Sequence, residues 1–230
     1  MTTYPASSAK DELLERLRGN LARVRARISA SGRDPSSVRI VAVTKTFGVE
    51  HVRAAYELGL RTFGENYVDE LCEKRRATRT LDTSWHYLGA LQTNKIARAT
   101  SCADVLSGVA REKELEKIAT SSPGAAIDVQ VDFTGEAQRN GVAPRDVAAL
   151  VRRARALELN VRGLMVVAPP GEGPTRKAFV GTVALADALG LVERSMGMSD
   201  DLELACELGT TEVRLGRALF GSRVGRGRLA

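Results

Sequence analysis

The chain has 230 residues and a mass of 24.7 kDa; 43% of the residues are hydrophobic and 27% are charged. This composition is typical of a globular protein, and a single domain of this length buries roughly 70% of the surface of its unfolded chain. No apolar run approaches the roughly 20 residues of a membrane span, and residues 1–8 lack the basic and apolar segments of a secretion signal. We therefore expect a cytoplasmic protein that does not contact membranes.

The net charge of +6 comes mostly from arginines spread along the chain, and aromatic residues make up only 4%. Nucleic-acid-binding domains usually gather their basic residues on one face, so no nucleic-acid partner is expected. Cys72, Cys102 and Cys206 are odd in number and far apart, which argues against disulfides and against a zinc site. Neither His51 nor His86 belongs to a spaced cluster of Asp, Glu or Cys, so a metal enzyme is not expected.

The first predicted element is a helix that begins after Ser8, whose pairing with Asp11 resembles a capping box. Apolar residues then recur at helical spacing up to Ile28, and Ser31 and Gly32 end the helix. Strand-like runs follow near residues 39–44, 60–63, 84–88, 103–106, 127–133, 161–167, 192–196 and 211–215, with helical patterns between them. Four of these helical patterns are followed by residues suited to left-handed helix ends, namely Gly59, Asn160, Gly190 and Gly209.

Eight strands alternating with helices in a chain of this length favour an α/β fold, a single (β/α)8 barrel preceded by an extra N-terminal helix. An open doubly wound sheet is the alternative. We place the barrel domain at residues 8–223 and interpret residues 224–230 as a basic C-terminal tail.

Function in such barrels collects at the carboxyl ends of the strands. The first strand ends in Thr44 and Lys45, and a lysine there can place a neutral amine in the barrel mouth, the form that attacks carbonyl groups. The alternative is a rim lysine whose amine reaches water. Asn66 follows the second strand, where it either faces a ligand or caps the next helix. Trp85, on the third strand, either lines a pocket or packs in the core.

The loops after strands seven and eight are where barrels commonly bind phosphate. Ser195 offers a hydroxyl there, and Gly216 allows an oxyanion to come close. Arg214 alternates with Val213 and Leu215, so it is expected to point into the barrel, where a buried arginine needs a partner. A lysine opposite a phosphate site indicates a carbonyl compound that carries a phosphate. Pyridoxal 5′-phosphate (PLP) and the sugar phosphates of Schiff-base aldolases both meet that description.

Taken together, the motifs resemble those of the pyridoxal phosphate homeostasis proteins, also known as the proline synthetase co-transcribed bacterial homologue family. The resemblance covers about residues 10–223, and its motifs are VAVTKT (41–46), FGENY (63–67), WHYLG (85–89), LQTNK (91–95), RGLM (162–165), SMGMSDD (195–201) and RLG (214–216). It implies a barrel like the N-terminal domain of alanine racemase that holds PLP as an aldimine.

Residue by residue, the resemblance makes Lys45 the aldimine lysine and Asn66 a neighbour of the cofactor ring. It implies that Ser195 and the backbone at Gly216 and Arg217 bind the phosphate and that Arg214 contacts the ring nitrogen. The family pattern has Thr or Ser where Arg217 stands, so a hydroxyl is lost there. Many relatives have lysine at the position of Arg139, and an arginine cannot form the aldimine.

The resemblance implies a PLP carrier in vitamin B6 homeostasis that has no turnover of its own and passes the cofactor to apo-enzymes. An amino-acid racemase or decarboxylase of the same fold type is the enzyme alternative. A nucleic-acid or protein adaptor that has lost the cofactor is the other.

Overall fold

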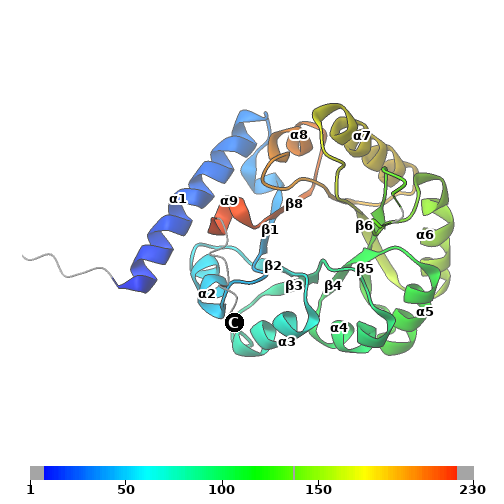
Figure 1. Cartoon of the computed structure of the whole chain (residues 1–230), viewed down its shortest axis with the longest axis horizontal. Coiled ribbons are helices and arrows are strands. Elements are labelled where there is room, and N and C mark those ends of the chain that lie inside the picture. The colour runs from blue at the N-terminus through cyan, green and yellow to red at the C-terminus, as the bar shows by residue number, and fades with distance from the viewer. Residues whose placement is uncertain (1–7, 137, 222–230) are drawn as a thin grey trace, which may run out of the picture.

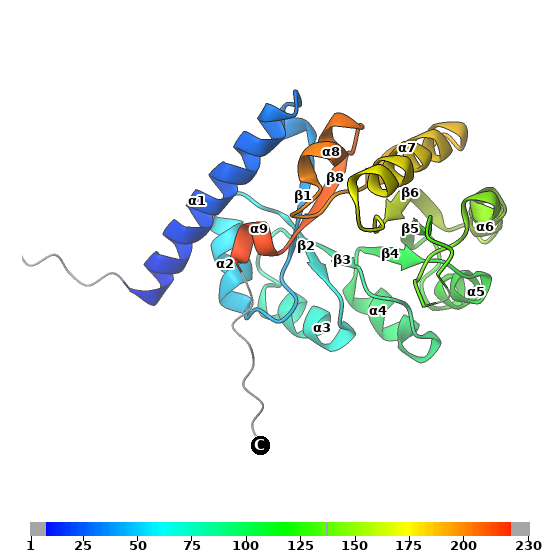
Figure 2. The ribbon, with the colours of Figure 1, turned by 45° about the horizontal axis from the view of Figure 1, so that its top comes forward.

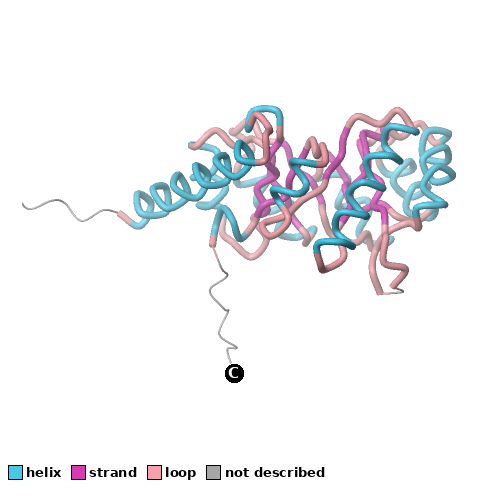
Figure 3. The backbone as a smooth tube through the Cα atoms, turned by 90° about the horizontal axis from the view of Figure 1, so that it is seen from above, coloured by secondary structure: helices cyan, strands magenta, loops and turns pink. Residues whose placement is uncertain are grey.

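The computed structural model describes residues 8–136 and 138–221. Eight parallel strands form a closed barrel in which each strand pairs with its neighbours in chain order and β8 pairs with β1. Helices surround this barrel, so the strands form the inner layer (Figures 1 and 3). The closed barrel confirms the predicted fold and excludes the open sheet. The predicted tail at residues 224–230 lies outside the described residues.

The strands are β1 (Arg39–Val43), β2 (Thr62–Glu65), β3 (Ser84–Tyr87), β4 (Val105–Val109), β5 (Ala126–Val131), β6 (Asn160–Val166), β7 (Glu193–Ser195) and β8 (Glu212–Leu215). The helices are α1 (Ala9–Ala30), α2 (Val49–Glu57), α3 (Val68–Ala77), α4 (Ile96–Cys102), α5 (Glu112–Ser121), α6 (Val147–Ala156), α7 (Glu172–Ala188), α8 (Leu202–Glu207) and α9 (Arg217–Phe220). Short 3-10 turns lie at η1 (Pro35–Ser37), η2 (Thr93–Lys95) and η3 (Pro144–Asp146). All eight predicted strands are present, and none of their ends is shifted by more than three residues.

The N-terminal helix α1 begins as predicted, because Ser8 and Asp11 form a reciprocal capping box. Its buried stripe includes Leu17, Val24 and Ile28. The helix runs along the outside of the ring, where it contacts α2, α8 and α9 (Figure 2). It therefore covers the seam where β8 meets β1.

Side chains alternate along each strand between the layer under the helices and the inside of the barrel. On β1, Ile40 and Ala42 belong to the apolar core between barrel and helices, whereas Val41 lies on the other face, beside Gly64 of the neighbouring strand β2. The barrel interior is largely polar, because Ser107, Asp128 and other buried polar side chains from neighbouring strands point into it. The apolar core of this protein is thus the layer outside the strands, and the barrel itself is filled by a polar network.

Two expectations are corrected by the structure. Glu158, with φ 58°, takes the left-handed position after α6, and Asn160 already begins β6. Cys72 and Cys102 form a disulfide, with Cα atoms 5.1 Å apart, and only Cys206 is free among the described cysteines. Consecutive helices of a barrel lie side by side, so α3 and the end of α4 meet although their cysteines are 30 residues apart in the chain. Among the described helices, none has an apolar stretch sufficient to span a bilayer.

Candidate functional site

A cavity of about 690 Å³ opens at the carboxyl ends of the strands. This volume lies in the usual range of small-molecule sites. Its lining residues are Val43, Lys45, Asn66, Leu88, Met165, Val167, Met198, Ser199, Asp200, Arg214, Gly216 and Arg217. Five of the six predicted site residues therefore meet in one cavity, and Ser195 is the exception.

Lys45 reaches this cavity because β1 ends at Val43, two residues before it. Val43 and Lys45 both line the cavity, as alternation along the strand requires. Lys45 is half-buried. Of the two interpretations of this lysine, the structure therefore favours the one in which its side chain belongs to the cavity.

Arg214 points into the barrel, as the alternation on β8 predicts, and it is 6% exposed. Its Nη1 donates to the Ser195 carbonyl at 2.6 Å and to the Ser195 hydroxyl at 2.8 Å, and its Nη2 donates to the Val166 carbonyl at 2.7 Å. Burial lowers the pKa of Arg214, and the nearby Glu212 carboxylate opposes that shift. These contacts hold the guanidinium in a single orientation at the cavity wall.

Ser195 lies below the cavity, 1% exposed, and its hydroxyl donates to Glu212 Oε1 at 2.8 Å. The pocket-facing hydroxyl of this loop is Ser199, which accepts a hydrogen bond from the Ala218 backbone N–H at 3.1 Å. The motif at residues 195–201 contains both serines, and sequence alone offers no way to choose between them. Gly197, with φ 97°, turns the chain between them, and a Cβ there would lie 2.6 Å from the Ala205 side chain.

The start of α9 lies beside Ser199 and completes this wall of the cavity. Gly216 and Arg217 line it through the first residues of that helix. The Arg217 guanidinium is ion-paired with Asp200. Because the first residues of a helix leave backbone N–H groups without intrahelical acceptors, this wall suits an anionic group.

Asn66 lines the cavity and does not cap α3, whose N-cap residue is Tyr67. Its backbone is fixed by close packing, since a Cβ on Gly89 would lie 2.3 Å from the Asn66 carbonyl oxygen. Trp85 is fully buried and packs on Phe63 with ring centroids 5.3 Å apart. The structure thus assigns Asn66 to the cavity and Trp85 to the core.

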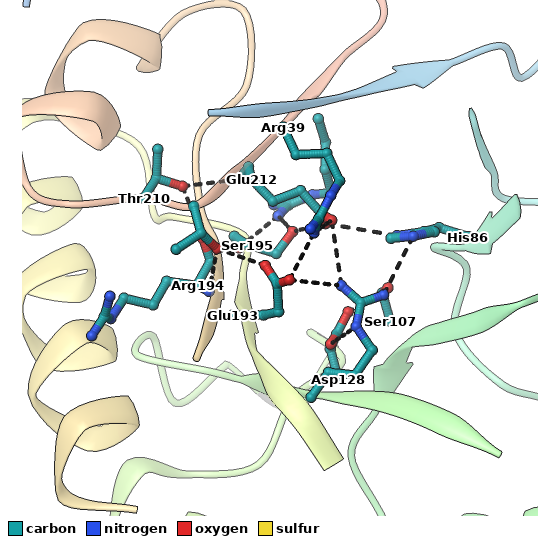
Figure 4. A network of polar contacts seen from close by, with 12 residues as sticks. Arg39, His86, Ser107, Asp128, Glu193, Arg194, Ser195, Thr210 and Glu212 are labelled. Atoms are coloured by element: carbon teal, nitrogen blue, oxygen red, sulfur yellow. Dashed lines mark hydrogen bonds and ion pairs between the residues drawn. The ribbon is translucent and has the colours of Figure 1, made fainter. Parts of the chain in front are cut away.

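Beneath the cavity, a buried polar network fills the barrel (Figure 4). In this network, a ring nitrogen of His86 and carboxylate oxygens of Asp128 and Glu212 all lie within 4.8 Å of one another. Such a group of atoms is of the kind that can hold a metal ion. No spacing pattern in the sequence predicts this cluster, because its three residues come from three separate strands. The positive charge here is Arg162, which lies 3.4 Å from His86 Nε2, 3.8 Å from Asp128 and 3.6 Å from Glu212. Arg162 supplies the cation that these groups would otherwise need, so the cluster gives no case for a metal.

The protonation states in this network follow from burial and from the neighbouring charges and hydrogen bonds. Burial lowers the pKa of His86 to about 4 and raises the pKa of Asp128 to about 6. Burial also acts to raise the pKa of Glu212, but His86, Ser195, Arg162 and Arg214 outweigh it and lower that pKa. Glu212 is therefore the carboxylate that balances the charge of the buried arginines.

Arg139 lies away from the cavity that Lys45 lines. It donates to the backbone carbonyls of Val167 and Ala168, at 3.3 and 3.5 Å, and is ion-paired with Glu136. It lines an adjacent cavity of about 780 Å³ between the loops after β6 and β7.

Comparison with known proteins decides the family. Residues 13–224 match the family described as "Alanine racemase, N-terminal domain". The chain is 39% identical over 217 residues to the pyridoxal phosphate homeostasis protein of Pseudomonas aeruginosa, covering 89% of this chain and 94% of that protein. It is 32% identical over 223 residues to that of Escherichia coli, covering 89% and 95%. The chain belongs to the pyridoxal phosphate homeostasis protein family.

A solved structure agrees with this membership. PipY of Synechococcus elongatus, described as determined without PLP, is 32% identical and superposes with a TM-score of 0.81 over 89% of this homeostasis-family chain and 100% of its own. The same protein, described as having PLP bound, superposes with a TM-score of 0.78. Alanine racemase of Clostridium difficile shares the fold, with a TM-score of 0.74 at 16% identity, and this chain covers 58% of it.

Proposed function

We propose that this protein binds pyridoxal 5′-phosphate in the cavity that Lys45 lines and serves as a carrier of that cofactor in the cytoplasm, within one domain spanning residues 8–223. The observation that carries the proposal is the meeting of Lys45, Arg214 and the start of α9 around one cavity, in a chain whose relative PipY was solved with PLP.

The residues present suit this cofactor. Its aldehyde needs a primary amine, and Lys45 is the lysine among the lining residues. Its phosphate needs donors, and the wall formed by Ser199, Gly216 and Arg217 offers backbone N–H groups and a hydroxyl. Apolar side chains such as Leu88 and Met165 suit an aromatic ring between these two ends. The volume of about 690 Å³ accommodates such a molecule.

When bound, pyridoxal phosphate supplies an aldehyde that reacts reversibly with amines and a ring that can draw electrons from an attached amino acid. Arg214 would work against the second property if its guanidinium faced the ring nitrogen, because a fixed cation there would disfavour protonation of that nitrogen. Arg214 would thus keep the ring a weak electron sink, and Lys45 would still hold the aldehyde. The site is therefore better suited to storage and delivery than to carbanion chemistry.

We infer that the protein has no turnover of its own. Racemisation needs a second acid–base group across the cofactor from the lysine. Among the described residues that line the cavity there is no Tyr, His or Cys, and the one carboxylate, Asp200, is paired with Arg217. Racemase activity would be recognised by exchange of the Cα hydrogen of an amino acid with solvent, and decarboxylase activity by release of carbon dioxide. We further propose that PLP-dependent apo-enzymes accept the cofactor from this protein.

The experiment that tests this proposal is reconstitution of the purified protein with pyridoxal phosphate. We expect a visible absorbance band, and after borohydride reduction we expect the pyridoxyl mass on the peptide that contains Lys45. Lys45→Ala should lose both signals while keeping its fold. Lys95→Ala is the matched control, because Lys95 is an exposed lysine of η2 that does not line the cavity. Attachment to another lysine, or an unchanged band in Lys45→Ala, would contradict the proposal.

A further inference from the structure

The turn that carries Lys45 has an unfavourable backbone conformation. Phe47 donates its backbone N–H to the Thr44 carbonyl at 3.0 Å, so residues 44–47 form a β-turn with Lys45 and Thr46 at its centre. Thr46 has φ 70°, in the left-handed region that this turn position favours for glycine and that β-branched residues avoid. Such a conformation is unfavourable and persists only where surrounding groups hold it.

Helix α3 supplies groups that hold this turn on both sides of Lys45. On one side, Lys74 Nζ donates to the Thr44 carbonyl at 2.8 Å. On the other, the Thr46 backbone N–H donates to Glu70 Oε2 at 2.9 Å. Lys74 and Glu70 are one helical turn apart and form an ion pair at 3.0 Å. The two side chains therefore brace the backbone directly before and directly after the cavity lysine.

The Lys74 ammonium is buried and fully hydrogen-bonded within this cluster. It is 5% exposed, and its ammonium contacts the Thr44 carbonyl, Glu70 and Glu65 Oε1, the last at 2.6 Å. An ammonium has three N–H donors, so these three acceptors use all of them. Glu65 also accepts from the Thr44 hydroxyl at 2.7 Å, which adds a second link between this cluster and the turn. Buried ion pairs add little net stability over apolar packing. The contacts of this cluster with the turn, and not a gain in stability, therefore account for its presence.

We propose that Glu70 and Lys74 are positioning residues, which keep the turn at residues 44–47 in the conformation that presents the Lys45 amine to the cavity. This inference rests on the proposed function, in which Lys45 bonds to the aldehyde of pyridoxal phosphate. On this proposal, Glu70 and Lys74 of α3 affect how fast the bond to Lys45 forms. They do not affect how tightly the cavity binds the rest of the cofactor.

The experiment separates these two quantities. The rate of covalent attachment is followed by the absorbance change on mixing with pyridoxal phosphate, and the adduct is mapped to Lys45 after borohydride reduction. Affinity is measured with pyridoxine 5′-phosphate, which carries an alcohol in place of the aldehyde. We expect Glu70→Ala to slow attachment between about 10- and 100-fold, since a misplacement of about 1 Å can cost 10²-fold. The affinity for the alcohol analogue should stay within about twofold of the wild type, a factor of two being less than 0.5 kcal/mol.

Three further variants sharpen the test. Glu70→Gln keeps an acceptor for the Thr46 N–H and should slow attachment less than Glu70→Ala. Glu73→Ala is the matched control, because it removes an exposed carboxylate from the same helix. Thr46→Gly added to Glu70→Ala should restore much of the rate, because glycine adopts a positive φ without steric cost.

The outcomes distinguish the two proposals. Absence of attachment to Lys45 in the wild type overturns the proposed function and this inference with it. Normal attachment in both the wild type and Glu70→Ala overturns the inference alone. Equal losses of attachment rate and analogue affinity, or an equally slow Glu73→Ala, would show general damage and would also overturn it.

Discussion

The disulfide between Cys72 and Cys102 leads to a quantitative prediction about stability. It joins α3 to the end of α4 and closes a loop of 30 residues. Both cysteines are half-buried, and neighbouring arginines on the two helices surround them in a surface cavity. Reduction therefore removes a crosslink from the unfolded chain while it leaves the folded packing largely unchanged.

The magnitude follows from the loop length. In the chain-entropy treatment, a closed loop of 30 residues lowers the entropy of the unfolded state by about 12 cal/mol/K, which is about 3.6 kcal/mol at 25 °C. Engineered and natural bonds often deliver less, so about 2–3.6 kcal/mol is the expected loss. For a chain of this size each kcal/mol corresponds to about 2–4 °C in melting temperature. Reduction should therefore lower the melting temperature by about 4–14 °C.

The assay compares urea unfolding of the protein with and without a reductant, after the thiols have been counted in the denatured state. We expect one reactive thiol, that of Cys206, before reduction and three afterwards. A Cys72→Ser/Cys102→Ser variant should match the reduced wild type and show no response to reductant. Cys206→Ala serves as the control, because it should keep the full response. Three thiols in protein prepared under oxidising conditions, or equal unfolding midpoints with and without reductant, would refute the reasoning.

Three other predictions concern the barrel interior and the loop after β3. The pKa of His86 falls on folding from about 6.5 to about 4. The stability that neutral His86 contributes is therefore fully present above pH 6.5 and is lost as the pH falls through 4. Denaturant titrations at pH 7 and pH 4 should show that the free energy of unfolding of His86→Gln rises by about 3 kcal/mol relative to that of the wild type at the lower pH. Gly89→Ala places a Cβ 2.3 Å from the Asn66 carbonyl, and we expect thermal unfolding to show a loss of about 1–3 kcal/mol together with weaker pyridoxal phosphate binding; unchanged binding would contradict the packing argument. Ser195→Ala removes a hydroxyl that donates to buried Glu212, and it should cost about 1–3 kcal/mol, measured by urea unfolding at pH 7, while a neutral effect would indicate that the carboxylate finds another donor.

Much of this protein could be predicted from sequence patterns. Eight strand-like runs and helices between them predict the barrel, and the alternation on β8 places Arg214 inside it. The position of Lys45 at the end of β1 places its side chain in the cavity. These features are accessible because a strand has a period of two residues, so that a local pattern fixes which side chains share a face.

Other features depend on which segments the closed barrel brings together. The choice between Ser195 and Ser199 as the hydroxyl that faces the cavity depends on the turn at Gly197, and the disulfide depends on the packing of α3 against α4. Lys74 bonds to a carbonyl 30 residues away in the chain. No local period carries such information, because these contacts form only when elements that are distant in sequence close around a common axis. The chain by itself thus determined the barrel and the cavity lysine, and only the tertiary structure decided which groups hold that lysine in place.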